Sequence, residues 1–211
     1  MSAGDYRIDV KADAQRGHTL VIDGSKLDST QTLTATSNHI LGHLKLIGGA
    51  GDDNLKGHNG DKLIGSAGSD QLKAVGHFHV TFSYGAASDS TGSAYDVIDN
   101  FNPKFDKIEV SASHPVTRVD PMIVAHVDPQ AIGQNYTGDI SGVPELSALG
   151  PQAAAIVKVV DQGDPHHVLD WYLVIDQNGT AGYQSGSDLV VRLEGASDVA
   201  ALSTANFTTH G

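Results

Sequence analysis

The sequence predicts an all-β protein built around a parallel β-roll, a flattened solenoid of about five coils of short strands joined by tight turns. Two observations predict this fold. Short alternating stretches rich in Val, Ile, Thr and Leu fill the first part of the chain, and a nine-residue pattern of glycine, aspartate and leucine follows them. No stretch before residue 48 keeps a helical period for more than a turn or two.

The first stretches occupy residues 6–47. Apolar and β-branched residues alternate there with polar ones, which indicates short strands, and Gly24, Ser25 and Asn38 mark turns between them. We expect repeat-poor coils over residues 1–47, built from the segments YRIDVKA, HTLVIDG, QTLTATS and HILGHLKLI.

From residue 48 the template G-G-x-G-x-D-x-L-x fits three successive units. GGAGDDNLK matches it fully, GHNGDKLI is one residue short, and GSAGSDQLK has one serine in place of glycine. Three successive matches are hard to explain by chance. The template positions are Gly48, Gly49, Gly51, Asp53 and Leu55, then Gly57, Gly60, Asp61 and Leu63, then Gly65, Gly68, Asp70 and Leu72.

Each unit predicts a glycine-rich turn and a short strand with one inward apolar side chain. Two units make one coil, so turns two units apart stack. Asp53 and Asp70 should therefore lie on one edge, one coil apart, and Asp61 on the opposite edge. Ca²⁺ takes about six to eight oxygen ligands, so it would neutralise stacked carboxylates and satisfy exposed turn carbonyls together. We expect calcium to hold the roll in shape.

The neighbours of Asp61 limit the number of ions. One unit upstream Leu44 occupies the aspartate position, and one unit downstream Val80 does. We therefore expect one well-formed site bridging Asp53 and Asp70, and at best a weaker site at Asp61.

The composition agrees with a cation-binding chain. The net charge is −12, and 22 of the 25 acidic residues are aspartate, which calcium loops use as a ligand and turns use for their own hydrogen bonds. Nucleic acid and anionic lipid favour dense Lys and Arg patches, which the chain lacks. We expect Ca²⁺ and not nucleic acid as a partner, with a merely acidic surface as the simpler alternative.

The sequence also excludes several classes. It has no cysteine, hence no disulfide, no thiol catalysis and no cysteine-ligated zinc. The start, MSAGDYRIDV, lacks a basic stretch followed by an apolar run, and no segment approaches the roughly 20 apolar residues of a membrane helix. We expect neither a cleaved signal peptide nor a membrane span.

The repeats resemble the RTX nonapeptides of proteins exported by Gram-negative type I secretion systems, such as serralysin-type metalloproteases, lipases, alginate epimerases and S-layer proteins. Residues 82–111 resemble the C-terminal cap of that family, in which S-D-S, D-x-I-x-D-F and D-K-I-D-L-S recur. The matching residues are Ser88, Asp89 and Ser90, then Asp96, Ile98, Asp99 and Phe101, then Asp106, Lys107 and Ile108.

WYLVIDQNGTAGYQSGSDLVVRLEG resembles the late strands of the cap, and ALSTANFTTHG resembles the terminal L-x-A-x-N-F element. The resemblance covers about residues 39–211. It implies a nonapeptide roll over residues 48–81 and a β-sandwich-like cap over residues 82–211. We expect a small amount of helix in the cap, around residues 143–149. In the family the extreme C-terminus is the type I secretion signal, which implies a secreted, extracellular or cell-surface protein.

Asp89, Asp96, Asp99 and Asp106 are candidates for a further calcium site in the cap. Strand-end turn caps are at least as common a role for such aspartates.

Rival chemistry finds less support. There is no H-E-x-x-H zinc motif and no G-x-S-x-G elbow, so we expect no enzyme. The 11 histidines include pairs that suggest a metal or haem site, but exposed loop histidines are the favoured interpretation because no third ligand can be assigned. The pairs are His39 and His43, His77 and His79, and His166 and His167.

Trp171 and Tyr172 are interpreted as core and rim of a late strand, with a carbohydrate platform as the alternative. We predict a non-catalytic, calcium-dependent module for type I secretion or surface anchoring. The sequence leaves open whether it is the C-terminal part of a larger S-layer-like or exported protein. A stand-alone module that binds haem, metal or cell-surface polysaccharide, the tail of a secreted hydrolase, and self-association stay open. A C-terminal part of a longer protein should show an incompletely covered apolar edge near residues 6–10.

Overall fold

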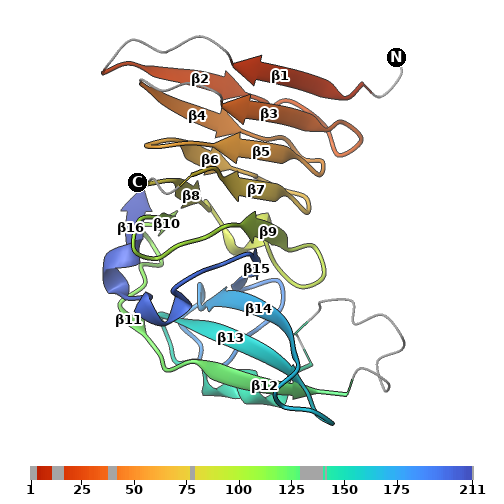
Figure 1. Ribbon diagram of the computed structural model, residues 1–211, viewed down its shortest axis with the longest axis vertical. Helices are drawn as coiled ribbons and strands as arrows, with labels where there is room; N and C mark the ends of the chain where they lie inside the picture. The colour runs from red at the N-terminus through yellow and green to blue at the C-terminus, as the bar shows by residue number, and fades with distance from the viewer. Residues whose placement is uncertain are drawn as a thin grey trace.

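The chain folds into two β-sheets that form a stacked roll at one end and a larger cap at the other (Figure 1). The predicted all-β class is confirmed, and the helices of the described chain are short 3₁₀ turns. The computed structural model describes residues 4–10, 17–37, 42–76, 79–128, 140 and 142–210. No helix in these ranges is long and apolar enough to cross a membrane.

Ten strands wind into five coils, with odd-numbered strands on one side of the roll and even-numbered strands on the other (Figure 1). Each of the first eight strands pairs in parallel with the strand two further along the chain. The strands are β1 (Tyr6–Val10), β2 (Thr19–Asp23), β3 (Leu33–Ser37), β4 (His43–Ile47), β5 (Asn54–Gly57), β6 (Lys62–Ile64), β7 (Gln71–Ala74), β8 (Thr81–Ser83), β9 (Asp96–Asp99) and β10 (Lys107–Ser111).

The single apolar position of each repeat builds the core of the roll. In the odd-numbered sheet Leu55 aligns with Leu72, and Leu72 with Ile98. In the even-numbered sheet Leu63 aligns with Phe82. All five side chains are 0% exposed, so in-register pairing stacks them into two facing columns that exclude water.

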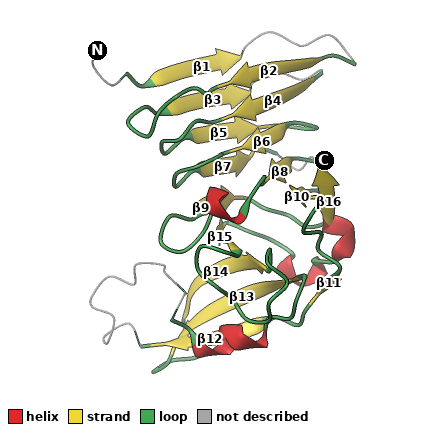
Figure 2. Cartoon of the chain, turned by 180° about the vertical axis from the view of Figure 1, so that it is seen from behind, coloured by secondary structure: helices red, strands yellow, loops and turns green. Residues whose placement is uncertain are grey.

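The odd-numbered sheet continues into the cap without interruption. β15 pairs in parallel with β9, and antiparallel pairing then joins β15, β14 and β13. A second apolar cluster lies between this sheet and the short helix η2 (Pro144–Ala148), where helix was expected (Figure 2). The remaining strands are β11 (Arg118–Val119), β12 (Ile123–Val127), β13 (Ala153–Asp161), β14 (Val168–Ile175), β15 (Leu189–Glu194) and β16 (Phe207–His210).

The even-numbered sheet ends at β16, which pairs in parallel with β10. Asn206 precedes this strand and is buried. Its Nδ2 donates to the carbonyl oxygens of Pro103 at 2.5 Å and Asp106 at 3.2 Å, and its Oδ1 accepts from the Ser203 N–H at 2.9 Å. The terminal N-F element therefore fixes the last strand onto the fifth coil.

The parallel roll extends beyond the nonapeptides. The expected boundary lay between residues 81 and 82, yet β9 and β10 form a fifth coil that pairs with β7 and β8. The long connection from residue 84 to residue 95 hides this coil from a search for a nine-residue period. Coil stacking depends on strand register and tolerates a longer loop.

The core of the roll generates a stability prediction. Leu63→Ala should lower the free energy of unfolding by about 2–5 kcal/mol, because Leu63 is 0% exposed and the shared sheet leaves little room for collapse. Urea unfolding followed by far-UV circular dichroism measures this. Met122→Ala is the control: Met122 is 51% exposed, so its loss should stay within about 1 kcal/mol. Equal losses from both variants would contradict a core made of the repeat leucines.

Candidate metal centre on one edge of the roll

The repeat aspartates stand where turns lead into strands. Asp53 precedes β5, Asp70 precedes β7 and Asp96 begins β9, and these three strands are neighbours in the odd-numbered sheet. Asp61 precedes β6 in the other sheet. The structure thus places Asp53 and Asp70 on one edge, one coil apart, and Asp61 on the opposite edge, which is the arrangement expected from the repeat.

A ladder of hydrogen bonds connects the aspartates of the first edge. Oδ1 of each accepts the backbone N–H one coil earlier: Leu33 to Asp53 at 2.6 Å, Asp53 to Asp70 at 2.7 Å, and Asp70 to Asp96 at 2.9 Å. The three residues are 2%, 0% and 0% exposed. We call Asp53, Asp70 and Asp96 the aspartate column. Asp96 was expected in a separate cap site, but it stands on this column.

The second carboxylate oxygens are unequally satisfied. Oδ2 of Asp53 accepts from the Gly49 N–H at 2.6 Å. Oδ2 of Asp70 and Oδ2 of Asp96 are buried and have no hydrogen-bond partner within the described ranges. The buried hydroxyl of Tyr84 interacts with Asp96 but lies outside hydrogen-bond geometry. Two buried oxygens without donors are the kind of group that a bound cation satisfies.

The column is electrostatically unfavourable when all its carboxylates are ionised. Burial raises the pKa of Asp70 from 3.8 to about 7, and repulsion from Asp53, Asp52 and Asp89 adds to it, against the hydrogen bond from the Asp53 N–H. Burial, with repulsion from Asp70, also raises the pKa of Asp96 well above its usual value. The pKa of Asp53 is raised by burial too. A cation beside the column would reverse these shifts.

Glycine lets the turns approach the carboxylates closely. A Cβ on Gly48 would lie 2.2 Å from Oδ2 of Asp53 and 2.4 Å from the carbonyl oxygen of Gly65, and a Cβ on Gly65 would lie 2.1 Å from Oδ2 of Asp70. Carboxylate and carbonyl oxygens therefore share this edge, and hard cations such as Ca²⁺ prefer that donor set. Backbone carbonyls of neighbouring turns crowd the remaining turn glycines in the same way: Gly49, Gly51 and Gly68.

The opposite edge holds a single repeat aspartate. Oδ1 of Asp61 accepts from the Leu44 N–H at 2.7 Å, and Oδ2 accepts from the His58 N–H at 2.8 Å. Leu44 and Val80 fill the aspartate positions one coil away, in the register expected from the sequence. The next carboxylate is that of Asp106, which accepts from the Val80 N–H at 3.0 Å. Gly57 and Gly60 flank this turn, and Gly60 has φ of 80°.

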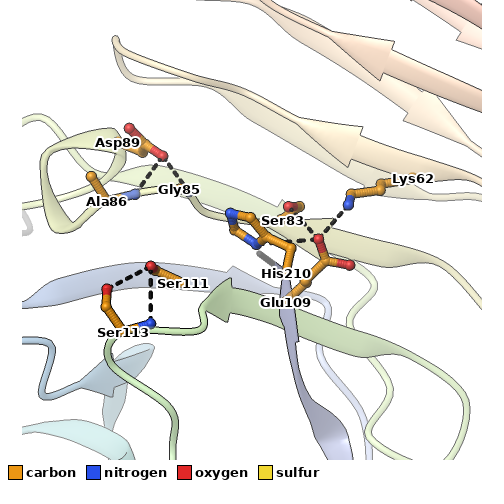
Figure 3. Close-up of polar contacts among 9 residues, drawn as sticks. All are labelled: Lys62, Ser83, Gly85, Ala86, Asp89, Glu109, Ser111, Ser113 and His210. Carbon is orange, nitrogen blue, oxygen red and sulfur yellow. Dashed lines mark hydrogen bonds and ion pairs between the residues drawn. The ribbon is translucent and has the colours of Figure 1, made fainter.

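The four cap aspartates do not gather. Asp89 accepts from the N–H groups of Gly85 at 2.7 Å and Ala86 at 3.0 Å, so it caps a turn near the column (Figure 3). Asp99 lies at the far end of β9 and pairs with Lys73. Asp106 lies on the opposite edge of the roll. Across the described ranges no three His, Asp or Glu side chains converge as a metal site, so ligation on the column would need backbone carbonyls.

The histidine pairs fall partly outside the described residues, because His39 and His77 do so. Nδ1 of His79 lies 2.6 Å from the carbonyl oxygen of Phe105. His167 lies in the turn between β13 and β14, with Nδ1 3.7 Å from Asp161. The ring of His43 lies against Gly60, where an added Cβ would be 2.1 Å from its Nδ1. These contacts are those of loop histidines, and none of the described histidines belongs to a group of three or more side chains that could hold a metal ion.

Trp171 and Tyr172 occupy opposite faces of β14. Tyr172 is 0% exposed and belongs to the cap core. Trp171 is half-buried, with Nζ of Lys158 5.9 Å from its ring centre. The two rings therefore form no shared platform for a sugar.

Sequence reasoning missed a polar cluster that anchors the last strand. Glu109 accepts a hydrogen bond from Ser83 at 3.2 Å, forms an ion pair with Lys62, and lies 3.2 Å from Nδ1 of His210 (Figure 3). The cluster joins β6, β8, β10 and β16. No local signal marks it, because its members are far apart in sequence.

One family model matches the chain. Residues 43–140 match the family described as peptidase M10 serralysin C terminal. The matched range contains the nonapeptides, the fifth coil and the beginning of the cap. It corresponds to the non-catalytic part of serralysin-type proteases. No curated protein matches the chain.

The raised pKa of Asp70 predicts a pH dependence for the ion-free protein. Between its ordinary value of 3.8 and about 7, Asp70 holds a proton in the folded state and not in the unfolded state. Stability in the presence of a calcium chelator should therefore fall as pH rises from about 4 to about 7, and the raised pKa of Asp96 extends the fall to higher pH. Urea unfolding at several pH values measures this. Asp70→Asn should make the fall in this window shallower without abolishing it, because the pKa values of Asp53 and Asp96 are raised too, and an unchanged profile would contradict the assigned shift.

Proposed function

Since residues 43–140 are of the serralysin C-terminal type, we propose that the chain is a non-catalytic secreted module whose fold is completed by calcium. The observation that carries the proposal is the aspartate column, with turn carbonyls at close range and two buried oxygens that have no donor among the described residues. Without a counter-ion this arrangement disfavours folding at neutral pH. With Ca²⁺ the same oxygens become ligands.

The main site is proposed between the stacked turns at residues 48–53 and 65–70. The carboxylates of Asp53 and Asp70 would bind the ion there together with turn carbonyls. Asp96 extends the column by one coil and provides a second position, beside Tyr84. Asp61 is proposed as a weaker ligand, because leucine and valine replace aspartate in the coils on either side of it.

Calcium dependence would give secretion its direction. Free Ca²⁺ is scarce in the cytoplasm and abundant outside, so the chain would stay unfolded before export and fold after it, because binding free energy becomes folding free energy. We propose that the C-terminal element serves the type I secretion apparatus and that β16 docks onto β10 once calcium has ordered the roll. Surface anchoring and the tail of an exported hydrolase are both compatible with this module.

A calcium titration tests the proposal. The purified chain should gain β signal in far-UV circular dichroism and melt at a higher temperature as Ca²⁺ rises, and Mg²⁺ should not substitute, because it demands tighter octahedral geometry. A fold and melting temperature unaffected by chelator would sink the proposal. The alternative of a stand-alone binding module would then be favoured, and it predicts that the chain retains a ligand whether or not calcium is present.

Substitutions at the aspartates test the position of the site. Asp53→Ala and Asp70→Ala should each remove most of the calcium-induced rise in melting temperature, whereas Asp61→Ala should remove less. Asp99→Ala is the matched control, because Asp99 pairs with Lys73 away from the column and should keep the full response. Equal losses at Asp53, Asp61 and Asp70 would contradict the proposed register.

A further inference from the structure

The first coil of the roll presents an uncovered apolar end. Tyr6, Ile8 and Leu20 are 47%, 39% and 45% exposed. They are inward-facing positions, because each aligns with a buried side chain of the next coil. Those buried partners are Leu33, Ala35 and Leu44. The first coil therefore leaves part of the apolar core exposed, which is typical of a surface that another polypeptide covers.

The same end carries the edge strands of both sheets, β1 and β2. Each is five residues long, contains no proline, and pairs with its inner neighbour in an uninterrupted register. Protected edges normally use prolines, bulges or inward-pointing charges. A hollow of about 130 Å³ opens beside β1, lined by Tyr6, Ile8, Leu27 and Leu33 among others.

The sequence of β1, YRIDV, is complementary to itself in antiparallel pairing. If Ile8 faces Ile8 of a second copy, Arg7 of each chain stands opposite Asp9 of the other. Within one chain Nε of Arg7 lies 3.4 Å from Asp9, and the two side chains are 74% and 33% exposed, so both are accessible for pairing across strands. The same twofold stacking places β2 over its counterpart and covers Leu20.

We propose that this end of the roll is a docking surface for a second copy of the chain, formed by antiparallel pairing of β1 with β1. The interface is isologous, so it closes at a dimer and leaves no matching surface for further copies. An upstream segment of a longer protein, or an unrelated strand, is the competing occupant. Either would leave the 211-residue chain monomeric.

Sedimentation velocity of the folded chain over a range of concentrations tests this, with circular dichroism confirming the fold in each sample. The chain should show a concentration-dependent dimer. R7D and D9R should each be monomeric, because either change sets like charges opposite one another twice. An equimolar mixture of R7D and D9R should form a heterodimer, since every cross-strand pair then has opposite charges. K104D, which alters an exposed ion pair in the loop between β9 and β10, should dimerise as the unmodified chain does.

The proposal is overturned if the unmodified chain is monomeric throughout. It is also overturned if R7D and D9R dimerise alone, or if their mixture stays monomeric. The test needs only a folded chain, so it is independent of whether Ca²⁺ binds at the aspartate column.

Discussion

The burial of aspartate in a column is the constraint on which the roll depends. Each carboxylate of the column ends a turn and accepts the N–H of the coil before it, so the bonds that stack the coils also bring the charges together. The cost of burying charge rises along the column from Asp53 toward the cap. Both oxygens of Asp53 accept hydrogen bonds, whereas Oδ2 of Asp70 and Oδ2 of Asp96 accept none from the residues that the structure describes. The register of the coils brings buried carboxylates close together, and the described side chains provide no positive charge to offset their repulsion. The stability of the roll therefore depends on how that repulsion is neutralised.

The apolar core cannot easily offset that cost. Each repeat contributes one inward leucine, so the roll is only two side chains thick, and each coil rests on its neighbours as in other solenoids. The cap adds the apolar packing and strand pairing that the short repeats do not provide. Its antiparallel strands β13, β14 and β15 continue the odd-numbered sheet, and β16 with the Glu109 cluster closes the even-numbered one. The last coil therefore stacks on an edge that the cap covers.

Where the sequence repeats, its period predicts the structure well. A nine-residue unit specifies the inward leucine and the alternation of edges, and the structure places Asp53, Asp61 and Asp70 accordingly. The nine-residue period cannot predict which residues stack where a loop changes length. Asp96 joins the column through parallel pairing of β9 with β7, across a 26-residue separation that no local pattern encodes. Ser66, which replaces a template glycine, has a left-handed φ of 76°, a backbone conformation that serine rarely adopts. Glu109 and His210 meet only because β16 returns to β10.

The two ends of the solenoid therefore differ in kind. At the cap, sheet continuity, Asn206 and the Glu109 cluster satisfy the last coil. At the other end, β1 and β2 have one neighbour each, and their inward side chains meet solvent. Stability in a solenoid is a sum of coil and interface terms, so a coil with one interface lacks half of the stacking that an internal coil has. Order should decline from the cap toward β1, and any strand that pairs with β1 stabilises the coil that is otherwise the first to open.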